Sequence, residues 1–141
     1  MSVLENIQKA LLCEIARDPV LSKLCLEAEG LSKDCHQMAS SATIVVGRPQ
    51  PQSAACNAQS VVLNDVLLSL IVSVADIPED DTASPLEIAE ILCRRLHNMR
   101  LGVNSARGKL LLRKTSPLEY IKGPTGTSQI KINFNINSIK I

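Results

Sequence analysis

The chain has 141 residues and a net charge of only +1 at pH 7, which argues against a general binder of polyanions. Tyr120 and Phe134 are its aromatic residues and tryptophan is absent, so almost nothing can stack on bases; this argues against aromatic-platform nucleic-acid modules. Five cysteines without a CxxC pair indicate incidental thiols in a reducing compartment, and the length indicates one domain, residues 1–141.

The N-terminal segment, residues 2–30, is expected to be helical. Ser2 and Glu5 have the spacing of a capping box, in which each side chain satisfies a backbone group at a helix start. Apolar residues then recur at helical spacing: Leu4, Ile7, Leu11 and Ile15. The sequence therefore predicts an amphipathic first helix.

A second helix is predicted after Asp18-Pro19. Proline interrupts the first helix, but it is well suited to the first position of a new one, with the aspartate as its cap. Gly30 would end this helix, because glycine adopts the left-handed conformation found after helix ends.

The next segment combines a short strand and a long loop. Thr43 to Val46 is an apolar run that ends at Gly47, and the following stretch is polar and contains prolines. We expect a strand followed by a surface loop over about residues 47–59, either functional or disordered.

The chain is organised around residues 61–77, its most continuously apolar stretch. Large apolar side chains occupy alternate positions, which predicts a β-strand: Val66, Leu68, Leu70, Val72 and Val74. Asp65 and Asp76 bracket only ten residues, about half of the roughly 20 that a membrane helix needs. We therefore expect no membrane partner.

A third helix has the clearest start signal. Ser84 and Glu87 form another capping box, with Pro85 at the first helical position, and the apolar pattern predicts a helix that Gly102 terminates. The acidic loop before this helix lacks the spacing and the glycine of a calcium-binding EF-hand loop, so we expect a solvated loop.

The last third of the chain predicts strands over 109–113, over 118–121 and from Ser128 to the C-terminus, with a turn at 123–127. The final strand alternates isoleucine or phenylalanine with asparagine or lysine, as an antiparallel strand with one buried face does. The order of elements gives an α+β domain, with a mainly antiparallel sheet of about four strands on two or three helices.

No cofactor, metal or catalytic motif stands out. Cys35 beside His36 could suggest a metal site, but no second pair has ligand spacing. His97 has no nucleophile or carboxylate at a catalytic spacing. A small enzyme that uses these residues stays a minor alternative.

Charged side chains are segregated along the sequence. Residues 76–93 contain six acids and no base, and residues 94–114 contain seven bases and no acid. This pattern complements the dipole of the helix that begins after Ser84. It would equally suit contacts between different surfaces of neighbouring copies.

Several segments, IQKALLCEIARDPVLSKLC, TIVVG, the long strand with its acidic loop, LEIAEILCRRLHNMRL and the final strands, resemble tail-terminator (tail-completion) proteins of long-tailed bacteriophages. The resemblance spans nearly the whole chain and lies in element order and apolar pattern. It implies a structural protein of the virion tail or neck, made in the host cytoplasm.

The resemblance further implies a ring, commonly of six subunits, that caps the tail tube and contacts the tail-tube protein and a head-completion or connector protein. DNA would meet the ring only by passing through it. Alternatives are another virion protein, such as a head-tail connector or tail-tube subunit, and a nucleic-acid-binding module that uses the basic segment 94–114.

Rings with more than two subunits in cyclic symmetry use two different surfaces per subunit. We therefore hypothesise that acids of one copy face bases of the next, with apolar residues from the sheet supplying most of the affinity. The candidate interface residues are Asp76, Glu79, Asp80, Asp81, Arg94, Arg95, Arg100, Arg107 and Lys109.

Overall fold

The computed structural model describes residues 2–30, 42–56, 61–75, 84–102, 109–111, 113–114, 118–122 and 127–140. Its elements, in chain order, are α1 (Val3–Ala16), the 3-10 helix η1 (Leu21–Lys23), β1 (Cys25–Ala28), β2 (Ala42–Val46), β3 (Ser53–Cys56), β4 (Val61–Ala75), α2 (Pro85–Leu96), β5 (Arg100–Gly102), β6 (Lys109–Leu111), β7 (Arg113–Lys114), β8 (Glu119–Lys122) and β9 (Thr127–Lys140).

A seven-stranded sheet is built around the long antiparallel pair β4 and β9. Its main order is β1-β2-β4-β9-β7, with β3 also paired to β4 and β8 also paired to β9. β1 runs parallel to β2, and the other pairs in this sheet are antiparallel. The α+β class with a mainly antiparallel sheet and two α-helices is therefore confirmed within the described residues.

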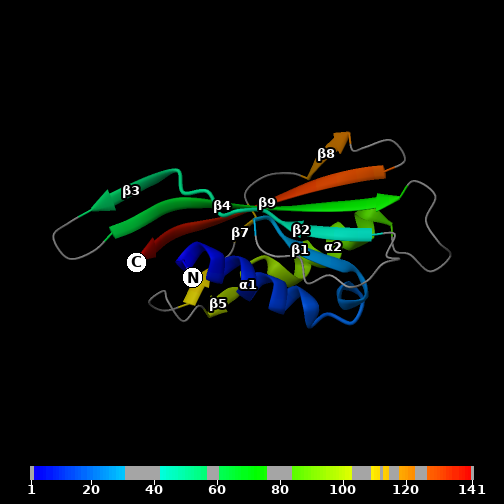
Figure 1. The fold of residues 1–141 in the computed structure, drawn as a ribbon, viewed down its shortest axis with the longest axis horizontal. Coiled ribbons are helices and arrows are strands. Elements are labelled where there is room, and N and C mark those ends of the chain that lie inside the picture. Colours follow the sequence, from blue (N-terminus) through cyan, green and yellow to red (C-terminus); the bar gives the residue numbers. More distant parts are fainter. Residues whose placement is uncertain are drawn as a thin grey trace.

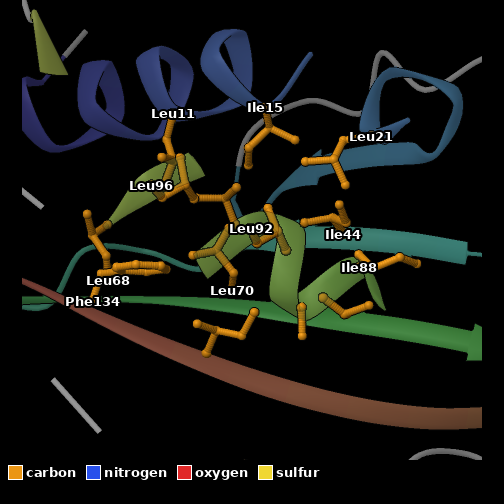
Figure 2. Close-up of a cluster of buried hydrophobic side chains, with 14 of the residues drawn as sticks. Leu11, Ile15, Leu21, Ile44, Leu68, Leu70, Ile88, Leu92, Leu96 and Phe134 are labelled. Carbon is orange, nitrogen blue, oxygen red and sulfur yellow. The ribbon is translucent and has the colours of Figure 1, made fainter. Parts of the chain in front are cut away.

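Both α-helices cover the same face of this sheet (Figure 1). The side chains that β4 and β9 turn toward the helices are fully or almost fully buried. In Figure 2, Leu11 and Ile15 of α1 lie with Leu92 and Leu96 of α2 above the sheet residue Leu70. The alternating apolar residues predicted for β4 thus line the sheet side of one continuous apolar core.

The start of α1 agrees with its predicted cap. The hydroxyl of Ser2 accepts a hydrogen bond from the backbone N–H of Glu5 at 3.1 Å. Ile7, Leu11 and Ile15 are fully buried, so the helical periodicity read from the sequence marks the inward face of the helix.

The second predicted helix is wrong. Asp18 does cap, accepting from the backbone N–H of Leu21 at 3.1 Å, but only the single 3-10 turn η1 follows before the chain extends into β1. β1 pairs with β2 over Cys25–Ala28, so backbone bonds to a strand distant in sequence outweigh the local helical pattern. Gly30 has a φ of +81°, but it follows a strand and not a helix.

The long loop predicted over 47–59 is also wrong in most of its described part. Gln50 forms an isolated bridge with Leu67, and β3 pairs with β4 from Ser53 to Cys56. The side chains of this stretch do not indicate a strand, because its pairing with β4 is made by backbone groups. β2, which was predicted, and β3, which was not, therefore follow one edge of β4 in succession. β3 and β1 are strands beyond the four expected.

α2 starts as predicted and ends earlier. Ser84 accepts from the backbone N–H of Glu87 at 3.2 Å, which confirms the cap. The helix ends at Leu96, and Asn98, with a φ of +61°, turns the chain into β5. Gly102 lies within β5, so its predicted role as the helix terminator is wrong.

The long strands contain a joint near Asp65, which has a φ of +50°. Val66 pairs with the buried Ile136, whereas Leu63 pairs with the buried Ile139, so the inward face changes from even to odd positions in both strands. A β-bulge lies between the Val46–Leu70 pair and the Gln50–Leu67 bridge. Over this interval the β2–β3 segment advances by four residues and β4 by three, so the β2–β3 segment has one extra residue. Beyond this joint, β3 and the adjoining ends of β4 and β9 form a three-stranded arm.

Candidate subunit interface

The described structure contains three of the predicted interface side chains. Arg94 and Arg95 lie in the last turn of α2, and Arg100 is an exposed residue of β5. Lys109 belongs to β6, though its side chain is not described. The remaining candidates, Asp76, Glu79, Asp80, Asp81 and Arg107, lie outside the described residues.

Arg95 binds within its own chain. Its Nε donates to the backbone carbonyl of Glu14 in α1 at 3.2 Å, and its Nη1 lies 3.6 Å from Oδ2 of Asp18. The other carboxylate oxygen of Asp18 accepts from the backbone N–H groups of Val20 and Leu21. Arg95 therefore fastens the end of α2 to the turn that follows α1.

Arg94 differs from its neighbour in exposure. It is exposed and lines an open cleft of about 390 Å³ together with Asp18, Pro19, Val20, Ile91 and Arg95. Val20 is 43% exposed, so the cleft offers an apolar surface beside the arginine. This combination could receive an apolar side chain and an acidic group from another protein.

The two ends of α2 carry opposite charge. Glu87 and Glu90 are exposed near its start, whereas Arg94 and Arg95 lie in its last turn. Glu90 and Arg94 are four residues apart and therefore neighbours on one side of the helix, whereas Glu87 lies about two turns from the arginines. The arrangement complements the helix dipole within one chain.

Two features that the sequence did not indicate are uncovered sheet edges. β3 pairs only with β4 in the described part of the chain, and all four of its residues are exposed. β8 pairs only with β9 there, and its Tyr120 is 72% exposed. No sequence signal could have located the β3 edge, because its residues resembled a loop.

The remaining candidate sites give no chemical centre in the described part of the structure. No group of three or more histidine, cysteine or acidic residues there could hold a metal ion. His97 is exposed at the end of α2, whereas Cys35 and His36 lie outside the described residues. Cys25 is disulfide-bonded, so the expectation of an incidental thiol is wrong for that residue, while Cys13, Cys56 and Cys93 form no disulfide.

None of the described helices is long and apolar enough to span a membrane. At the level of sequence, no known protein family and no curated protein matches this chain. Comparison with solved structures, however, finds the same fold elsewhere.

One similar structure is a chain from the virion of a native gene transfer agent particle. It shares 17% sequence identity, with a TM-score of 0.68, over 98% of this chain and 98% of its own. A second solved structure, for which no role is named, has a TM-score of 0.57 at 11% identity and covers 97% of this chain and 92% of its own. This chain therefore shares, over nearly its whole length, the fold of a chain from the virion of a gene transfer agent particle.

Proposed function

We propose that this protein is a structural component of a phage-like virion. The observation that carries the proposal is the likeness to the gene-transfer-agent chain, which extends over 98% of both chains. The resemblance of the sequence to tail terminators points to the same class of particle and rests on a different observation, the order and apolar pattern of the elements.

Within that class we propose a tail terminator, which forms a ring of six copies, caps the tail tube and joins it to the head-completion proteins. Opposite charge at the two ends of α2 supports contacts between unlike surfaces, as a cyclic ring requires. The exposed cleft beside Arg94 and the uncovered sheet edges supply further surfaces for such contacts.

The mass of the purified protein tests the ring directly. Native mass spectrometry and light scattering after chromatography should give one closed oligomer, and negative-stain images should show rings. Added to polymerising tail-tube protein of the same virus, the ring should halt tube growth. A chain that stays monomeric at high concentration in low salt, even with tube ends present, would contradict the proposal.

A protein with another role in the neck or tail would share this architecture. The same experiment, in which the protein is added to polymerising tail-tube protein, distinguishes these roles. A tube subunit would copolymerise along the tube, and a connector would bind the head and leave tube growth unchanged. The nucleic-acid alternative predicts sequence-preferring, submicromolar binding of a labelled duplex in physiological salt. We expect only weak binding that disappears steeply as salt rises, because phosphate contacts release counterions.

A further inference from the structure

The residues of β3 carry no charge and no proline that would keep another chain from its outer edge. Ser53, Ala54, Ala55 and Cys56 are all exposed, and none of them is charged or a proline. Edge strands ordinarily carry charges, prolines or bulges that prevent pairing with another chain. The small side chains of β3 would let another backbone approach closely along this edge.

The outer edge of β8 is as long as that of β3. Both strands have four residues, and β8 carries Tyr120, the most exposed large apolar side chain in the described structure, on its surface. An exposed aromatic ring of this kind is typical of the buried centre of a protein interface. A surface of alanines is one against which such a ring can pack.

The two edges are also placed as a repeating contact requires. β3 lies on the β4 side of the sheet and β8 on the β9 side, and Figure 1 shows them in opposite halves of the molecule along its long axis. β3 runs antiparallel to β4, while β8 runs antiparallel to β9 and hence in the same direction as β4. Side by side in neighbouring copies, β8 and β3 would therefore meet as antiparallel strands.

We propose that β3 of one copy pairs in antiparallel fashion with β8 of the next copy, so that the sheet continues from subunit to subunit. The contact is head to tail, and it places Tyr120 beside Ala54 of the neighbouring β3, which lies on the same face of the sheet. Strand addition of this kind gains affinity from backbone hydrogen bonds and specificity from alternate side chains. This inference rests on the proposed ring and names its contact surface.

Tyr120 provides a built-in probe, because the chain has one tyrosine and no tryptophan. Its fluorescence should be strongly quenched by acrylamide in a dilute monomer and several-fold less in the assembled ring. Equal quenching in monomer and ring would overturn the proposed contact and leave the ring itself standing. Protection that appears only when tail-tube protein is added would overturn it too, because the tube, and not a second copy, would then cover this edge.

Cross-linking tests the partner strand. The register of the cross-strand pairs puts Glu119 and Ala55 on the face of the sheet away from the helices, and Cys56 on the other face. In a background without the exposed thiols (Cys13→Ser, Cys56→Ser), the double variant Glu119→Cys, Ala55→Cys should therefore form disulfides between neighbouring copies under mild oxidation. Non-reducing gels should then show a ladder of covalent oligomers that ends at the ring size. Glu90→Cys, Ala55→Cys in the same background is the matched control, because Glu90 is exposed on α2, and it should give no ladder.

The variant Ala55→Lys adds the charge that the β3 edge lacks, and it should prevent assembly while the monomer keeps its melting temperature. Rings that form normally with this variant would overturn the pairing, and so would rings of the Glu119→Cys, Ala55→Cys variant that give no cross-link between copies. A wild-type protein that stays monomeric would overturn both this contact and the proposed function. The two failures are therefore distinguished by the mass of the wild-type protein.

Discussion

The side-chain amide of Gln8 in α1 donates a hydrogen bond to the backbone carbonyl of Glu29, 3.0 Å away at the end of β1. The same nitrogen lies 3.3 Å from the carbonyl of Val46 and 3.2 Å from that of Gly47 at the end of β2. Gln8 is only 2% exposed, and its amide is a donor for the carbonyls of Glu29 and Gly47, whereas the carbonyl of Val46 also accepts from the backbone N–H of Glu29. One polar side chain thus aligns α1 with the parallel strands.

Gln8→Leu should lower the free energy of unfolding by about 1–3 kcal/mol, because it keeps most of the volume but removes the donor that serves the carbonyls of Glu29 and Gly47. Urea denaturation followed by circular dichroism measures the change. Lys9→Ala, at the exposed neighbouring position, is the control and should change stability by no more than about 0.5 kcal/mol. Equal melting of wild type and Gln8→Leu would show that water replaces the amide.

Arg94 and Arg95 form a natural pair of test positions. Arg95→Leu should cost about 1 kcal/mol of stability, since it removes the bond to the carbonyl of Glu14 and leaves Asp18 unpaired on a partly exposed surface. Arg94→Leu should leave the denaturation midpoint nearly unchanged and weaken assembly instead. If the two variants change stability equally, the internal role assigned to Arg95 is wrong.

Ser84→Ala should destabilise the fold by about 1 kcal/mol, because it removes the acceptor for the backbone N–H of Glu87 at the start of α2. Ser84→Asp retains an acceptor and should preserve stability. An unchanged midpoint in the alanine variant, measured in guanidinium, would mean that the cap contributes nothing.

Asp65 tests the joint of the long strands. Its side chain is exposed, so substitutions there chiefly report on its positive φ. Asp65→Val should cost about 1–2 kcal/mol, because a β-branched residue disfavours the left-handed region. Asp65→Gly should have a stability equal to or above that of the wild type, since glycine adopts this conformation without strain. A valine variant as stable as the glycine variant would contradict this account of the backbone.

Charge reversal tests the interface hypothesis. Changing Glu79, Asp80 and Asp81 to lysine should slow or abolish ring formation in light scattering, while reversing the facing bases as well, with Arg94→Glu and Arg100→Glu, should restore it. The expected effect is mainly on association rate and orientation, because each exposed pair contributes only about 0 to 1 kcal/mol. Normal ring formation by the triple variant would contradict the interface hypothesis. The segregated charges would then only complement the helix dipole within one chain.

Much of the candidate interface could not be predicted from the sequence. The segregated charges predicted both Arg94 and Arg95 as interface residues. Only the packing of α2 against the end of α1 shows that Arg95 is bound within the chain and Arg94 is exposed. The strand β3 and its exposed edge could not be predicted, because its small residues do not alternate between apolar and polar. Its pairing depends on the free backbone edge of β4, which is a property of another strand.

By itself the sequence determined the elements whose signals are local. The serine caps began α1 and α2, and alternating apolar residues specified β4 and β9, because caps and periodicity act within a few residues. Tertiary structure alone decided that residues 25–28 and 53–56 become strands and that α2 ends before Gly102. In both strand segments, backbone hydrogen bonds to a neighbouring strand outweigh a weak local preference, and such bonds leave no trace in side-chain pattern.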